Sequence, residues 1–183
     1  MLQGDSDGYR QVCQRVLERF SGSSDPNILH LVARTCALAP GAVPDRAQPV
    51  KLAEKALAAR PKLGWFLHTL GLAHYRAGQL EQAVSCFKKS MEVDPGWYHV
   101  LDWLPLAMAH FRLGDAEDAR RWLAKAVESI DKTPRNPDST FFLGYSLTDH
   151  LECQLLRAEA EALLGIKGKK ESGKSVQPSG KSR

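Results

Sequence analysis

The stretch Leu67–Pro95, LHTLGLAHYRAGQLEQAVSCFKKSMEVDP, decides how the rest of the chain is read. Two runs with helical spacing of apolar residues lie on either side of Gly78, which is free to adopt the positive φ that ends a helix. The proline at the end of the stretch cannot continue the second run. Small residues at Gly71 and Ala83 would let two antiparallel helices approach closely, with Phe87 filling the space beside them. The stretch therefore predicts a helix-turn-helix unit.

This unit recurs along the chain. A second copy follows 36 residues later, and a weaker first copy precedes the stretch, with Pro61 lying 34 residues before Pro95. The two better copies span about 63–94 and 96–131. The repeated places of the last copy are occupied by Trp103, Leu106, Ala107, His110, Gly114, Ala119, Leu123 and Ala126. Two unrelated amphipathic hairpins would not match at so many linked places.

These residues resemble the tetratricopeptide repeat (TPR) family. The family pattern is W-x2-L-G-x2-Y, then A-x3-F, then P, over about 34 residues. Here it is carried by Leu67, Leu70, Gly71, His74, Ala83, Phe87 and Pro95. The resemblance implies an all-α fold, a TPR-like α-α superhelix of about three helix pairs with a C-terminal capping helix.

The phrases TCALAPGAV, LAEKALAARP and LLRAEAEALLG extend the resemblance over most of residues 4–165. They are similar to TPR regions of bacterial multidomain proteins, where such regions follow serine/threonine kinase or WD40-type domains. The kinase motifs themselves do not occur in this sequence. The resemblance implies an accessory interaction region of a bacterial regulatory or signalling protein.

We divide the chain into three parts. Residues 1–24 form an N-terminal helix that resembles the second half of a repeat, residues 25–165 form the repeat domain with its capping helix, and residues 166–183 form a disordered basic tail. The N-terminal helix leaves three hypotheses open: the chain is a piece of a longer polypeptide, its N-terminal end packs on something else, or this helix is a native cap. Asp25 and Pro26 predict the start of the next helix, as N-cap and first residue.

The last third of the chain contains a proline inside a predicted helix and a final helix without a partner helix after it. Pro105 lies inside the first helix of the last copy, so we expect that helix either to begin with Asp102 as N-cap or to kink. The sequence 146–165 predicts a final helix that covers the last repeat, as terminal caps do in helical arrays. Its expected inward stripe is Leu147, Leu151, Leu155, Ala158 and Ala162.

Composition and charge restrict the class of protein. The hydrophobic fraction of 43% and the charged fraction of 25% are those of a globular protein, and no apolar run reaches membrane-spanning length. The N-terminus lacks the pattern of a signal peptide. The residues after Gly165 include six basic residues and one acidic residue, Glu171, so their net charge is +5. Since the formal net charge of the whole chain is +4, the rest of the chain carries −1. A nucleic-acid or membrane-surface role would have to rest on the tail alone.

The sequence predicts no enzyme and no cofactor. Hydrolase, zinc-protease, P-loop and EF-hand motifs do not occur. The four cysteines stand far apart without a C-x-x-C pair, which favours core residues in a reducing compartment, the cytoplasm. His74 and His110 occupy the aromatic place of the repeat, so we expect packing there and no metal site. We expect the scattered acidic residues to lie on solvated helix faces.

What remains as a functional feature is a surface. In TPR modules the first helix of each unit lines a concave groove, and the resemblance transfers that role to ten residues. These are Trp65, His68, Leu72, Tyr75, Arg76, Leu101, Leu104, Met108, Phe111 and Arg112. Leu72 and Met108 stand where the family's carboxylate clamp has Asn, so we expect an apolar, aromatic groove edged by arginines, suited to a helix or an apolar peptide with an acidic residue. The alternative is that the aromatic residues only pack between units.

The sequence therefore predicts a non-catalytic protein–protein interaction module that takes a protein or peptide, with no small-molecule substrate, no membrane and no favoured nucleic acid. One alternative is a structural spacer that links domains or self-associates. Another is a nucleic-acid or membrane-surface binder that acts through the basic tail.

Overall fold

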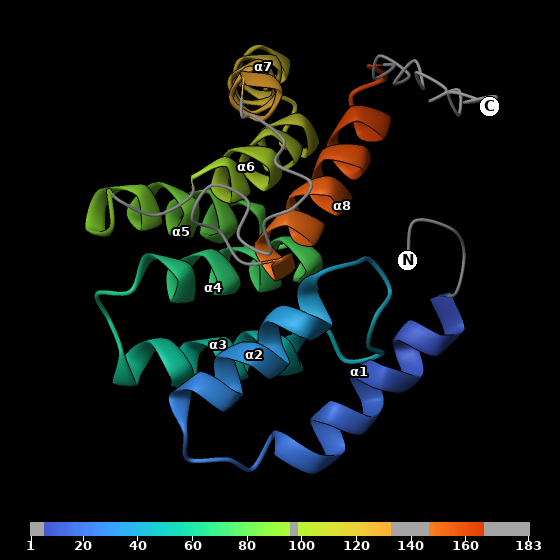
Figure 1. Ribbon diagram of the computed structural model, residues 1–183, viewed down its shortest axis with the longest axis vertical. Coiled ribbons are helices and arrows are strands. Elements are labelled where there is room, and N and C mark those ends of the chain that lie inside the picture. The colour runs from blue at the N-terminus through green and yellow to red at the C-terminus, as the bar shows by residue number, and fades with distance from the viewer. Residues whose placement is uncertain (1–5, 96–98, 133–146, 167–183) are drawn as a thin grey trace, which may run out of the picture.

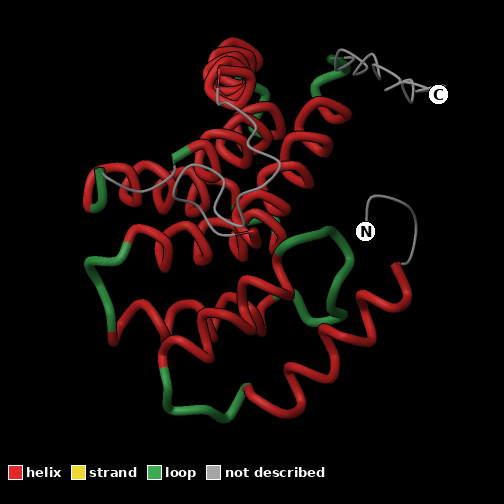
Figure 2. The backbone as a smooth tube through the Cα atoms, in the orientation of Figure 1, coloured by secondary structure: helices red, strands yellow, loops and turns green. Residues whose placement is uncertain are grey.

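The computed structural model describes residues 6–95, 99–132 and 147–166, and every regular element within these ranges is a helix (Figure 2). This confirms the all-α class. The helices are α1 (Ser6–Phe20), α2 (Pro26–Ala37), α3 (Ala47–Ala59), α4 (Gly64–Ala77), α5 (Leu80–Val93), α6 (Val100–Arg112), α7 (Ala116–Lys132) and α8 (Leu147–Leu163). None of the described helices is both long enough and apolar enough to cross a membrane.

Six of these helices form three stacked pairs, as the repeat predicts (Figure 1). Helices α2 and α3, α4 and α5, and α6 and α7 pack as hairpins, and neighbouring pairs stack through α2 on α4 and α4 on α6. We call the surface formed by α2, α4 and α6, the first helices of the pairs, the concave face. Helix α1 packs on α2 at one end of the array, and α8 packs mainly on α6.

The turns inside the better repeats follow the sequence prediction. Gly78 and Gly114 end the first helices with φ of 82° and 86°, a conformation that a residue with a Cβ rarely adopts. Each glycine amide donates to the carbonyl three residues back, at 3.1 Å in both turns. These bonds satisfy carbonyl groups at the helix end, so the second helix can turn back at once.

The close helix crossing predicted at Gly71 is present, with a different partner. A Cβ built on Gly71 would lie 2.6 Å from Cε1 of Phe87, so only a residue without a side chain fits against this ring. Ala83, the small residue that the sequence places opposite, is buried, and so is Ala107, the counterpart of Gly71 in the last repeat. The aromatic ring of the second helix fits directly against the glycine of the first.

Two helix starts test the capping predictions. Asp25 caps α2 as predicted, because its carboxylate accepts the Asn27 amide at 2.8 Å. Of the two expected starts of α6, the one with Asp102 as N-cap is wrong: α6 begins at Val100, so Asp102 lies in the first turn and Pro105 in the second. The Asp102 carboxylate is engaged instead by two imidazoles, His68 on α4 at 3.1 Å and His99 at the start of α6 at 3.4 Å.

Helix α1 is attached to α2 through a tyrosine. The Tyr9 hydroxyl donates to the Thr35 carbonyl at 2.6 Å and accepts the Ala39 amide at 3.1 Å. Cys13 and Leu17 of α1 are buried and belong to the core. The proposed division into 1–24, 25–165 and 166–183 stays a prediction, and residues 167–183 lie outside the described residues.

Candidate functional site

The ten residues predicted to line the groove lie on α4 and α6, which pack against each other. Their exposure divides them. Trp65 and Phe111 expose 40% and 38% of their surface, Arg112 is exposed and Arg76 is half-buried. The other six are buried: His68, Leu72, Tyr75, Leu101, Leu104 and Met108. Most of this surface is therefore not open to a partner in the present arrangement of the chain.

Helix α8 occupies the concave face. It contacts the last repeat, as predicted for a terminal cap, and lies along α6 (Figure 1). Its side chains also reach α4 and α2. The predicted inward stripe is wrong, since Leu151 is 49% exposed and Ala158 and Ala162 are also exposed. The buried side of α8 consists of Glu152, Cys153, Leu156 and Ala160.

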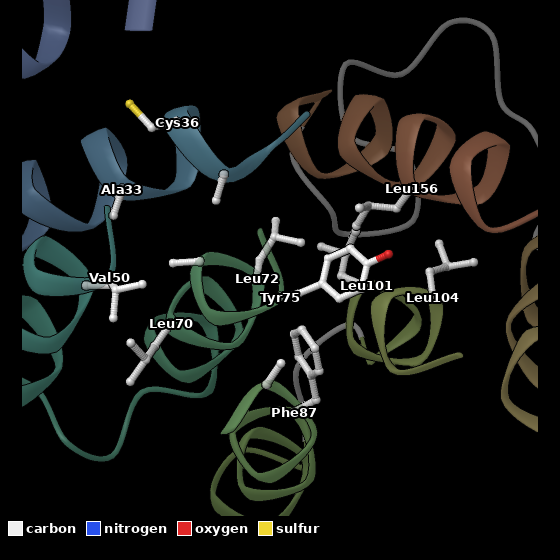
Figure 3. Close-up of a cluster of buried hydrophobic side chains, with 14 of the residues drawn as sticks. Ala33, Cys36, Val50, Leu70, Leu72, Tyr75, Phe87, Leu101, Leu104 and Leu156 are labelled. Carbon is white, nitrogen blue, oxygen red and sulfur yellow. The ribbon is translucent and has the colours of Figure 1, made fainter. Parts of the chain in front are cut away.

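The centre of the contact is apolar. Leu156 is fully buried and points from α8 toward Tyr75 and Leu101 (Figure 3). Two guanidinium groups lie near the Tyr75 ring, with the Cζ atoms of Arg76 and Arg112 5.3 and 5.1 Å from its centroid. A leucine on a helix thus fills the middle of the predicted groove, with aromatic and cationic groups around it.

One end of the contact is a buried network of charges. Glu152, only 2% exposed, accepts from Arg34 Nε at 2.6 Å and from His68 Nε2 at 3.0 Å. The other imidazole nitrogen of His68 contacts Asp102 Oδ1 at 3.1 Å, and Arg34 also pairs with Asp149 at 2.5 Å. The network joins α2, α4, α6 and α8. The expectation that acidic residues are solvated is wrong at Asp102 and Glu152, because each has a cationic partner inside the fold.

The network changes the protonation of its members. Burial alone would lower the pKa of His68, but hydrogen bonds and charges of Asp102 and Glu152 outweigh it and raise this pKa to about 9. Burial opposes the charge of Glu152 as well, yet His68 and Arg34 lower its pKa to about 2. His68 is thus an imidazolium at neutral pH. By contrast, burial, with Arg34 and His68 adding to it, lowers the pKa of His30 to about 4.

The other end of the contact is held by Arg76. Its guanidinium donates to the carbonyl oxygens of Ala37 and Leu38, at 2.8 and 3.0 Å, where α2 ends. It also forms a bidentate ion pair with the Glu159 carboxylate of α8, in which Nη2 lies 2.6 Å from Oε2. The α2 carbonyls fix the orientation of the Arg76 guanidinium. Two of its N–H groups therefore point toward a carboxylate on the helix that packs on the concave face.

Sequence reasoning placed His68 and Arg76 in the groove and missed their partners. Arg34 lies on α2, in the weaker first copy of the repeat, whose residues the resemblance does not assign to the groove. Glu152 and Glu159 lie seven residues apart and so share one side of α8. An acidic pair at that spacing, opposite two basic groove positions, is the signal that could have revealed the contact.

The described residues also contain one group with the geometry of a cation site. Ligand atoms of His110, Asp115 and Asp118 lie within 4.8 Å of one another. The previous repeat makes the same contact with a neutral amide, since His74 Nδ1 lies 2.6 Å from Gln79 Oε1, as His110 Nδ1 lies 3.1 Å from Asp115 Oδ2. We interpret both as contacts that fasten the end of the first helix to the start of the second.

Comparison with known proteins finds a family match and distant structural likenesses. Residues 65–97 match the family described as Tetratricopeptide repeat. Among solved structures, MamA 41-end from Desulfovibrio magneticus RS-1 is similar, with 20% sequence identity and a TM-score of 0.43, over 74% of this chain and 99% of that chain. No curated protein matches the chain.

Proposed function

We propose that this chain, which carries a tetratricopeptide repeat within three stacked helix pairs, is a non-catalytic interaction module whose concave face receives a helix of a partner protein. The observation that carries the proposal is α8. It occupies the concave face as a bound helix would, with Leu156 in the apolar centre and a carboxylate at each end. Apolar and aromatic side chains with basic groups at the edge of this face support the proposal.

Two aromatic side chains of α4 and α6 remain exposed. Trp65 lies at the start of α4 beside His30, with ring centroids 5.3 Å apart, and Phe111 lies at the end of α6. Large exposed rings at the edge of a lined groove are typical of protein interfaces. They support contacts between α4 and α6 and a partner protein.

The setting of this function is inferred from the sequence resemblance. We propose a bacterial regulatory or signalling protein, in which this chain is an accessory region linked to kinase- or WD40-type domains, and we place it in the cytoplasm. Cys13, Cys36, Cys86 and Cys153 are all free thiols, which supports a reducing compartment. Protein partners are proposed, without small-molecule substrate, nucleic acid or membrane.

Photo-crosslinking tests the interaction surface. A photoreactive amino acid is placed at Trp65 or at Phe111, both exposed, and at Gln82 on the outer surface of α5 as a matched control. After irradiation of cells that contain the full chain, we expect one protein adduct shared by the two groove positions and missing from the control. Adducts of equal yield at all three positions, or none at the groove positions, would refute a concave-face partner.

One observation favours the alternative of a self-associating spacer. An apolar groove of about 240 Å³ lies between α1 and α2 and is lined by Val16, Phe20, Ile28, Leu31, Val32 and Thr35. Leu31 is 55% exposed and also borders a second groove beside α8. If a second copy covers this groove, light scattering will show a dimer that Leu31→Glu converts to monomer; a monomeric wild-type chain excludes this alternative.

A further inference from the structure

We propose that α8 is an intramolecular ligand of the concave face, and that the partner is a helix with the same pattern, Glu-x3-Leu-x2-Glu, which must displace α8 to bind. This inference rests on the proposed function and specifies its ligand. In α8 the pattern is formed by Glu152, Leu156 and Glu159, whose spacing of four and three residues places them on one side of a helix.

The concave face is built to receive these two carboxylates. Arg34 and His68 converge on the first from two different helices, and Arg76 receives the second. Arg76 keeps this orientation through the carbonyls of α2, which do not depend on α8. A helix of the wrong charge would leave the cations at both ends without an acidic partner in a buried site, which is costly.

A cap that only covered the last repeat would not need this network. Burying charges costs desolvation free energy, and apolar side chains of the same size usually stabilise a contact as well or better. What buried charge pairs supply is discrimination between ligands, because a helix without the matching carboxylates is rejected. The acidic pair of α8 therefore carries the features of a recognised ligand.

Competition follows from the covalent link between α8 and the repeats. A tethered helix has an effective local concentration of about millimolar order. A partner helix with the same contacts must overcome this advantage, so the intact chain binds it more weakly than a chain whose α8 has been loosened. The structure thus places a self-inhibiting ligand in the site that we assign to the partner.

Peptide binding to the full-length chain tests this inference. A fluorescent peptide of residues 147–165 is titrated with the wild-type chain and with a chain that carries Glu152→Gln and Glu159→Gln. We expect the loosened chain to bind the peptide at least about tenfold more tightly than the wild type, since each lost charge-assisted contact of α8 is worth about that factor. A peptide with the same two substitutions serves as the control ligand and should bind at least about tenfold more weakly than the native peptide.

Circular dichroism is used as a control to check that the loosened chain is still folded. If it does not fold, Glu159→Gln alone is used, because this carboxylate is partly exposed. A dimer of the loosened chain that the peptide dissociates gives the same support, with a second copy supplying the helix. Equal binding by wild-type and loosened chains, or equal binding of native and control peptides, overturns the inference. If that happens while Trp65 and Phe111 still crosslink to a partner, competition by α8 is wrong and the interaction function stands.

Discussion

The buried imidazolium of His68 makes a quantitative prediction about pH. Its pKa is about 9 in the folded chain, against 6.5 for a free histidine. The folded state therefore binds a proton that the unfolded state releases, so the stabilisation is complete below pH 6.5 and is lost as the pH rises to about 9. At 1.36 kcal/mol per pH unit, the free energy of unfolding should fall by about 3 kcal/mol over this range.

Acid should destabilise the chain for a different reason. The pKa of His30 is lowered to about 4 in the folded state, so the unfolded state binds a proton first and stability is lost as the pH falls from 6.5 to about 4. Glu152, with a pKa of about 2, adds a loss that begins below pH 4.5. We therefore expect a stability maximum near pH 6.5.

Urea denaturation at half-unit intervals from pH 4 to 9 measures both slopes. His68→Gln is the matched variant, because its amide can contact Asp102 and Glu152 but does not titrate in this range. We expect this variant to lose most of the decline between pH 6.5 and 9 and to keep the decline below pH 6.5. A wild-type stability that is flat from pH 6.5 to 9, or a decline that persists unchanged in His68→Gln, would refute the reasoning.

Two further predictions concern packing and are measured by urea denaturation at one pH. Leu156→Ala should lower the free energy of unfolding by about 2–5 kcal/mol because this side chain is fully buried. Leu151→Ala, on the exposed side of α8, should change it by less than about 1 kcal/mol. Equal effects of the two substitutions would contradict the orientation of α8. Gly71→Ala should cost about 1–3 kcal/mol despite the higher helix propensity of alanine, because the added Cβ meets the Phe87 ring. Gly22→Ala, where a Cβ meets nothing within 4 Å, should be close to neutral; the reverse order would exclude the proposed close crossing.

Local sequence signals were sufficient for the repeat framework. Gly78 and Gly114 mark turns through a backbone requirement that few other residues meet, and Gly71 marks a crossing through its missing side chain. Asp25 marks a helix start through a single hydrogen bond. Each of these features depends on one residue and its near neighbours, so the sequence alone could locate it.

The position of α8 depends on contacts between distant residues. Glu152 meets Arg34 across 118 positions and His68 across 84. A helix with apolar residues on more than one side does not reveal from its own sequence which side is buried, and the apolar stripe that included Leu151 was the wrong choice. The side of α8 that carries Glu152 and Glu159 is buried because it pairs with cations on α2 and α4. The sequence of α8 alone does not contain these partners.

Hydrogen exchange of α8 in the full-length chain tests most directly whether this helix occupies the concave face through its charges. The amides of residues 147–163 should exchange at least about 100-fold more slowly than those of the same sequence as a free peptide. In a chain with Arg34→Met and Arg76→Met, α8 should lose this protection while α4 and α5 keep theirs. Exchange of α8 at the rate of the free peptide in the wild-type chain would contradict the account.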